Sequence, residues 1–178
     1  MAKPKVPLEE FVKKLNRASQ IDYARLAAYI DGEGHLGISV SPPRGRGVTP
    51  RHCMVMTVTN TSELLFQWIT STFGGKAIMA NHNNRKPNTK PCWRWLVSEL
   101  QAEEVVRRCL PYFIIKGEQA RIALAFRDLI NETRSIGKEV ESSVVEARES
   151  LRRNIVALNS AKGFGIVKSG LDRPAKVS

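Results

Sequence analysis

The spacing of hydrophobic residues changes twice along this chain in the same order, and this repeat limits the folds that the chain can adopt. Apolar side chains recur every three or four positions over residues 7–17 and again over about 20–31, as they do in amphipathic helices. The spacing then falls to two, and residues 36–40 and 51–60 alternate as the strands of a hairpin do. A basic turn rich in proline and glycine separates the two predicted strands.

The second half of the chain repeats this order. Ser62 is a good N-cap for the next helix, and Ser98 with Gln101 forms a capping box ahead of another. The remaining elements are expected as a helix at 63–73, strands at 76–81 and 92–97, and helices at about 98–109, 117–131 and 139–158. The predicted fold class is therefore α+β, an αββαββα core with a four-stranded antiparallel sheet and additional C-terminal helices.

The length of the chain fits one domain. We expect a single domain over residues 1–160, followed by a basic tail over 161–178 that has no fixed structure in isolation. No apolar run approaches the ~20 residues that a membrane span needs, and the N-terminus lacks the apolar segment of a secretion signal. The three cysteines form no C-x-x-C pair. These features predict an intracellular protein with reduced thiols, in a prokaryotic cytoplasm or an organelle, and no membrane partner.

Basic residues are concentrated in one part of the chain. The net charge is +11, and the stretch from Gly34 to Ser98 contributes +7 of it, because its eight basic residues face a single acid, Glu63. Such a concentration favours a docking surface for a polyanion such as DNA. The alternative is a solvated basic surface that binds nothing.

The segment LAAYIDGEG, residues 26–34, ends a predicted helix with an acid between two glycines. A carboxylate at the C-terminal end of a helix opposes the helix dipole, so helix stability does not favour Glu33 at this place. Carboxylate and backbone carbonyl oxygens are ligands that Mg²⁺ takes. Glu33 is therefore either a metal ligand or an exposed acid in a turn.

This segment resembles the LAGLIDADG motif of homing endonucleases. The residues that match letter for letter are Leu26, Ala27, Ile30, Asp31 and Gly34. Ala28 stands where the family most often has glycine, and Glu33 replaces the usual second aspartate. The predicted order of helices and strands is also that of the single-motif members, so the resemblance extends over nearly the whole chain and implies their fold.

The resemblance also implies a homodimer. Single-motif members pack their motif helices at a two-fold axis, which would place Ala27 and Ala28 at the interface and bring two Glu33 carboxylates together. It further implies Mg²⁺, with Mn²⁺ as a substitute, held by Glu33 and the backbone of Gly32. Metal ions between two carboxylates relieve their repulsion and activate water for phosphodiester hydrolysis.

Two further catalytic residues follow from the resemblance. Lys116 matches a basic residue near the scissile phosphate, where a cation stabilises developing charge, and Asn60 matches a polar residue that orders water. By the sequence alone, Lys116 could instead be an ordinary lysine in a turn, and Asn60 a cap at the end of a strand. The arginine that some members have one helical turn beyond Asn60 is here Leu64.

One face of the sheet is expected to contact double-stranded DNA. In the family a β-ribbon lies in the major groove, where the four base pairs are distinguishable. By alternation Ser39 and Ser41 point to one face and Ile38 and Val40 to the other, and we expect the polar face to meet DNA. The candidate contacts are Ser39, Ser41, Arg44, Arg46, Arg51, Thr57, Asn81, Arg85, Lys86 and Arg94.

The sequence thus predicts a homodimeric, Mg²⁺-dependent homing endonuclease, intron-encoded, that cuts both strands of a pseudopalindromic DNA target of about 20 base pairs. Two alternatives remain open. One is a maturase of the same fold that binds its intron RNA, and the other is a DNA-binding protein without catalytic activity. Retention of Glu33 and Lys116 favours the nuclease, although a maturase could keep both functions.

Overall fold

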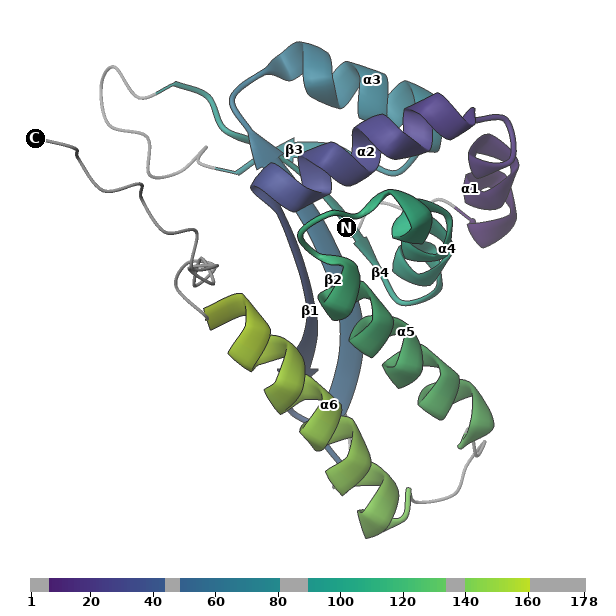
Figure 1. Cartoon of the computed structure of the whole chain (residues 1–178), viewed down its shortest axis with the longest axis vertical. Helices are drawn as coiled ribbons and strands as arrows, with labels where there is room; N and C mark the ends of the chain where they lie inside the picture. Colours follow the sequence, from purple (N-terminus) through teal and green to yellow (C-terminus); the bar gives the residue numbers. More distant parts are fainter. Residues whose placement is uncertain (1–6, 44–48, 81–89, 134–139, 161–178) are drawn as a thin grey trace, which may run out of the picture.

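The chain folds into helices packed against one four-stranded sheet (Figure 1). The computed structural model describes residues 7–43, 49–80, 90–133 and 140–160. In chain order the elements are α1 (Leu8–Leu15), α2 (Gln20–Glu33), β1 (Gly34–Ser41), β2 (Arg51–Asn60), α3 (Glu63–Phe73), β3 (Ala77–Met79), β4 (Trp93–Ser98), α4 (Leu100–Cys109), a 3-10 turn (Leu110–Tyr112), α5 (Gly117–Glu132) and α6 (Ser142–Ser160). This order confirms the predicted α+β fold class. The predicted tail, residues 161–178, lies outside the described residues.

The sheet has the strand order β1-β2-β4-β3, and every neighbouring pair is antiparallel. β2 pairs with β1 from Arg51 to Val58, whereas its pairing with β4 begins only at Val55. The first four residues of β2 therefore pair with β1 alone, and the two strands form a ribbon that extends past the four-stranded part. Helices α5 and α6 pack against this ribbon (Figure 1).

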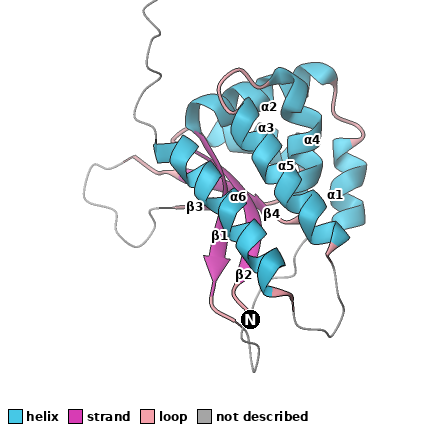
Figure 2. Cartoon of the chain, turned by 60° about the horizontal axis from the view of Figure 1, so that its bottom comes forward, coloured by secondary structure: helices cyan, strands magenta, loops and turns pink. Residues whose placement is uncertain are grey.

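Alternate side chains of the sheet point toward the helices and form the core. The fully buried ones on the strands are Leu36, Met54, Met56, Val58, Trp95 and Val97. Helices α1 to α6 contribute apolar residues to the same cluster, including Phe11, Ile30, Phe66 and Ile155. In Figure 2 α6 crosses in front of the strands, on this covered side. Within the described ranges no helix is both long and apolar enough to span a membrane.

Local sequence features explain where the first helices begin and end. Ser19 and Asp22 form the reciprocal capping box of α2, and the Ser62 hydroxyl accepts a hydrogen bond from the Leu65 amide at the start of α3. After α3, Gly74 and Gly75 adopt φ angles of +81° and +75° that side chains rarely allow. A Cβ at Gly75 would also lie 2.6 Å from Trp95 Nε1, so this turn requires glycine for the approach of the indole.

Two local predictions are wrong, and one residue is more exposed than its neighbours on the same face. The capping box at Ser98 does not form, because β4 continues through Ser98, and α4 begins after Glu99 without a side-chain cap. Val40 points to the face opposite Ser39 and Ser41, as predicted, but it is exposed because it lies near the end of an edge strand. The strand expected over 76–81 is formed only by Ala77–Met79.

Candidate active site

Glu33 is the last residue of α2, and β1 follows it without a loop. The next residue, Gly34, makes this junction possible: a Cβ there would lie 2.6 Å from both the Cα and the carbonyl oxygen of Ile30. The helix expected to end near Asp31 thus continues for two residues more. This continuation holds the exposed Glu33 side chain at the boundary between helix and sheet.

Asn60 lies beside Glu33. Its Nδ2 donates a hydrogen bond to Glu33 Oε2, and its Oδ1 accepts one from the Ser62 amide at 2.7 Å. The antiparallel pairing of Gly34 with Val58 brings the start of β1 and the end of β2 together. The amide orients the carboxylate, and α3 orients the amide in turn.

Lys116 reaches the same end of α2 from another element. It stands directly before α5, and its Nζ donates a hydrogen bond to the Asp31 carbonyl oxygen at 2.5 Å. Burial lowers the pKa of the Lys116 ammonium, and the negative charge of Asp31 opposes this shift. The site therefore contains a carboxylate, an amide and a partly buried amine, from three distant parts of the chain.

Asp31 is a site residue to which the sequence analysis gave no role. Its carboxylate is 7% exposed and accepts hydrogen bonds from three successive amides. These belong to Ile114 at 2.8 Å, Ile115 at 3.2 Å and Lys116 at 2.8 Å. Asp31 thereby fastens the turn before α5 to α2. Only the motif match singled this residue out, because its partners are 83 to 85 positions away.

One chain supplies a single exposed carboxylate here. No group of three or more His, Cys, Asp or Glu side chains able to hold a metal ion exists in the part of the chain that the structure describes. An exposed glutamate and a helix-end carbonyl are hard oxygen donors, and they fit an ion that keeps several waters. A closed metal cage is not what these residues form.

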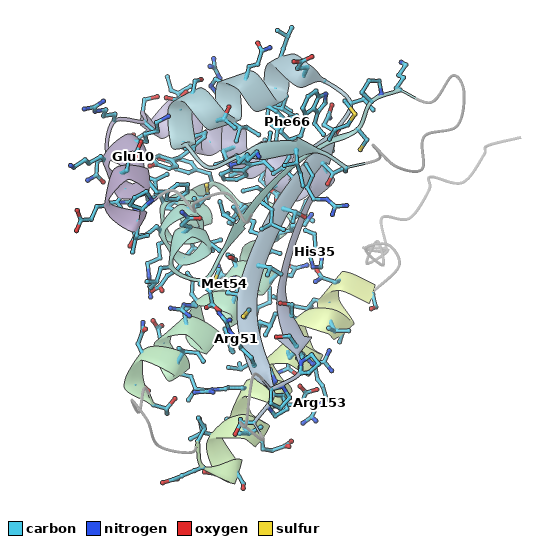
Figure 3. The ribbon with its side chains drawn as sticks, turned by 180° about the vertical axis from the view of Figure 1, so that it is seen from behind. Glu10, His35, Arg51, Met54, Phe66 and Arg153 are labelled. Carbon is cyan, nitrogen blue, oxygen red and sulfur yellow. The ribbon has the colours of Figure 1, made fainter. Side chains whose placement is uncertain are left out.

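The predicted DNA-contacting residues within the described ranges share the uncovered face of the sheet. Their strand register places them together: Ser41 is opposite Arg51, Ser39 is opposite Cys53, and Arg94 is opposite Thr59. Thr57 and His35 face each other on the same side. Figure 3 views the molecule from this side, with His35 and Arg51 at different heights along the ribbon.

Not all of these side chains are equally free. Arg51 lies 3.7 Å from the Glu99 carboxylate, and the hydroxyls of Ser39 and Ser41 donate to carbonyl oxygens of β2. Arg94 is exposed. Arg44, Arg46, Asn81, Arg85 and Lys86 lie outside the described residues.

The two alanines predicted at a dimer contact differ. Ala27 is 0% exposed and packs into the core of its own chain, so its assignment to the interface is wrong. The reason is the helical period, which turns Ala27 inward with Leu26 and Ile30. Ala28 is exposed, and it belongs to an exposed stripe of α2 formed by Ile21, Arg25, Ala28, Tyr29 and Gly32. We call this the α2 stripe.

Comparison with solved structures identifies the fold. No protein-family model matches the sequence, and no curated protein is similar to it in sequence. The homing endonuclease I-CvuI, in complex with the I-CreI target, superposes with a TM-score of 0.63 at 19% identity, over 82% of this chain and 86% of that one. The LAGLIDADG homing endonuclease I-GzeII superposes with a TM-score of 0.58 at 15% identity. The chain has the LAGLIDADG homing endonuclease fold.

The LAGLIDADG fold found here agrees with the resemblance of residues 26–34, which form the C-terminal part of α2 and its junction with β1. The archaeal intron-encoded homing endonuclease I-Vdi141I is also similar, with a TM-score of 0.61 at 15% identity, over 81% of this chain and 87% of that one. The match with I-GzeII covers 73% of this chain but only 43% of that one. The match therefore spans most of the length of I-CvuI and of I-Vdi141I, but less than half of the length of I-GzeII.

Proposed function

We propose that this protein is a homodimeric, Mg²⁺-dependent endonuclease that cuts both strands of a specific double-stranded DNA target. The observation that carries the proposal is the arrangement at the end of α2, where Asn60 contacts the Glu33 carboxylate and Lys116 contacts Asp31. The solved neighbours I-CvuI and I-Vdi141I are described as homing endonucleases in complex with DNA. The shared fold supports double-stranded DNA as the substrate of these residues.

The proposed chemistry is hydrolysis of a phosphodiester. Water attacks phosphorus and the bond to one ester oxygen breaks, so negative charge develops on the phosphate and on the leaving oxygen. Mg²⁺, or Mn²⁺ in its place, would be held by Glu33 and the nearby backbone at Gly32, and it would lower the pKa of bound water and stabilise that charge. Lys116 contributes a second positive charge, and Asn60 orients both Glu33 and solvent.

The α2 stripe is the proposed two-fold interface. Its large apolar side chains are well exposed, Ile21 at 64% and Tyr29 at 39%. Beyond the backbone of its own helix, a Cβ at Gly32 would meet no atom of the described residues within 4 Å, so no contact among them requires glycine there. A second helix packed closely against the stripe would require it. An isologous contact would also give each DNA strand its own Glu33.

The uncovered face of the sheet is the proposed DNA-reading surface. Ser39, Ser41, Arg51, Thr57 and Arg94 lie on this face, and Arg44, Arg46, Asn81, Arg85 and Lys86 extend the proposal beyond the described residues. Two such faces in a dimer cover about two helical turns, or about 20 base pairs. We further propose an intracellular, intron-encoded enzyme of a prokaryote or an organelle.

Glu33→Gln tests the proposal, because it keeps the shape of the side chain and removes its charge. In Mg²⁺, on DNA that carries the intron insertion site, we expect cleavage to fall by about two orders of magnitude or more. Binding measured in Ca²⁺ stays within a few-fold of the wild type. Glu118→Gln, an exposed acid in the first turn of α5, is the matched control and keeps full activity.

Each other result has a definite meaning. Undiminished cleavage by Glu33→Gln would remove Glu33 from the mechanism. Specific DNA binding by a wild-type protein that never cuts would indicate a non-catalytic DNA-binding protein. Tight binding of intron RNA with faster splicing, and no cutting of DNA, would indicate a maturase.

A further inference from the structure

A pocket far along the β1–β2 ribbon lies away from the proposed catalytic residues, although one proposed DNA contact, Arg51, is part of its lining. It has a volume of about 340 Å³ and lies between the start of β2, the C-terminal end of α5 and the first part of α6. Its polar lining includes Arg51, His52, Glu99, Thr133 and Arg148. It lies at the end of β2 opposite to Asn60, the residue that contacts Glu33.

Arg148 is buried in this pocket, and none of the described residues gives it a balancing negative charge. The residue is 9% exposed, and its Nη2 donates a hydrogen bond to the neutral Thr133 hydroxyl at 3.1 Å. Its Nε has no hydrogen-bond partner. Burial lowers the pKa of the Arg148 guanidinium, and in the described part of the chain no carboxylate opposes this effect. A buried charge without a counterion is costly, so this arrangement favours binding of an anion.

His52 also lines this pocket and carries a second buried atom without a hydrogen-bond partner. Its side chain is 2% exposed, and its Nε2 lies 3.2 Å from Glu149 Oε2. Its Nδ1 has no partner. Glu149 therefore fixes the ring through one nitrogen and leaves the other available, which is how a ligand-binding histidine is commonly oriented.

Among the described residues that line the pocket the acid is Glu99, and it is already paired. Glu99 forms ion pairs with Arg127 at 2.7 Å and with Arg51 at 3.7 Å. Its backbone holds a positive φ of 55°, which is unfavourable for a residue with a side chain. Since Glu99 is occupied by these two arginines, it does not neutralise Arg148. For the described lining residues, the unbalanced charge is therefore positive.

We propose that this pocket binds a phosphate group, with Arg148 as the main ligand, His52 Nδ1 as a second polar contact and Thr133 as the residue that orients the guanidinium. A planar guanidinium with a free Nε matches the oxygens of a tetrahedral oxyanion. The phosphate could come from solution, as inorganic phosphate or a phosphate monoester, or from the backbone of duplex DNA beside Arg51. The inference does not depend on nuclease activity.

Thermal unfolding of the full-length, DNA-free protein tests the site with inorganic phosphate as the probe. At constant ionic strength, exchange of chloride for phosphate is expected to raise the unfolding temperature of the wild type in a saturable manner. Arg148→Met loses this response, and in phosphate-free buffer it unfolds at the same temperature as the wild type or higher, because an unbalanced buried charge has been removed. A purely structural arginine would lower the unfolding temperature when replaced.

Matched variants make the result specific. Arg153→Met, on the same helix but exposed and paired with Glu146, keeps the wild-type phosphate response. Arg148→Lys keeps the charge but lacks the free Nε, and we expect at least a tenfold weaker half-saturation. It serves as the test variant if Arg148→Met does not fold. Glu33→Gln keeps the phosphate response, so failure of the nuclease proposal leaves this one testable.

DNA binding distinguishes the two sources of phosphate. If the ligand is a backbone phosphate, Arg148→Met weakens binding to all duplexes alike and lowers the salt slope by about one. If the ligand is free phosphate, DNA affinity is unchanged and the protein–DNA complex still responds to phosphate. The proposal is overturned if the wild type responds to phosphate no more than to chloride, or if Arg148→Met keeps the full response.

Discussion

Lys116 contacts Asp31 twice, once through its backbone amide to Oδ1 at 2.8 Å and once through Nζ to the carbonyl oxygen at 2.5 Å. The first contact fastens the turn before α5. The second holds the Lys116 ammonium at the backbone of Asp31, which is two residues before Glu33. One aspartate thus sets both the place where α5 begins and the place where the cation lies.

Asp31→Asn therefore affects folding and cleavage together. The amide cannot accept three backbone hydrogen bonds with the strength of a carboxylate, so we expect a loss of about 1.5–3 kcal/mol in the free energy of unfolding. Urea denaturation measures this loss. Glu33→Gln, two residues further on, is the control, and its free energy of unfolding stays within about 0.5 kcal/mol of the wild type because Glu33 is exposed. Equal stability of both variants would contradict the role given to Asp31.

The burial of Lys116 predicts that the stability of the wild type relative to Lys116→Met depends on pH. Because burial lowers the pKa of Lys116, the folded state binds its proton less tightly than the unfolded state does. Protonation then favours unfolding. The wild type gains stability relative to Lys116→Met as the pH rises through the lowered pKa toward the ordinary value of 10.5, and the difference is constant below that range. Urea midpoints of the wild type and Lys116→Met at a series of alkaline pH values measure this gain in stability. Lys76→Met is the control for loss of an exposed lysine. An opposite slope would refute the prediction.

Ala28→Arg tests the proposed interface. A long charged side chain in the middle of the α2 stripe separates two closely packed helices, so we expect the dimer dissociation constant to rise at least tenfold in sedimentation experiments. Ala125→Arg, at an exposed alanine of α5, is the matched control. Ala27→Leu behaves differently, since it overpacks the core and lowers the free energy of unfolding by about 1–3 kcal/mol. A wild-type dimer constant for Ala28→Arg would place the interface elsewhere.

Arg94→Ala tests which face of the sheet reads bases. Arg94 lies within β4 on the uncovered face, where a rigid backbone can direct its guanidinium into the groove. We expect this variant to relax the preference for one base pair in each half-site, at a cost of about 1–3 kcal/mol. Arg51→Ala has a smaller effect because Glu99 already pairs with Arg51. Binding-site selection gives the base profile, and Lys86→Ala is expected to weaken all sequences alike. An unchanged base profile for Arg94→Ala would show that the uncovered face of the sheet is not the face that reads DNA.

Much of the fold could be predicted because it depends on local patterns. The alternation over residues 51–60 predicted β2 with its observed bounds, and the cap at Ser62 begins α3 as expected. The cap at Ser98 fails because pairing with Val55 keeps that residue in β4. Tertiary pairing decided between two states that the local sequence allowed equally.

The site was less predictable, since its contacts join distant parts of the chain. The motif directed attention to Glu33, but no spacing rule shows that Asp31 holds amides more than eighty positions away. The helical period shared with Leu26 and Ile30 predicts that Ala27 points inward, whereas its small size alone favours a close contact between helices. The sequence does not predict the pocket at Arg148, because whether a buried nitrogen has a hydrogen-bond partner depends on residues that are distant in the chain.

The β1–β2 ribbon has a consequence for how such a protein changes over time. Asn60, which contacts Glu33, lies at one end of β2, and Arg51 lies at the other end, about 30 Å away at the usual rise per residue. Between Arg51 and Met54, β2 pairs with β1 alone, so substitutions on its uncovered face disturb few neighbours. Under the proposed function, new target preferences would accumulate there one residue at a time while the residues around Glu33 stay unchanged, so the ribbon is where selection for a new target would act.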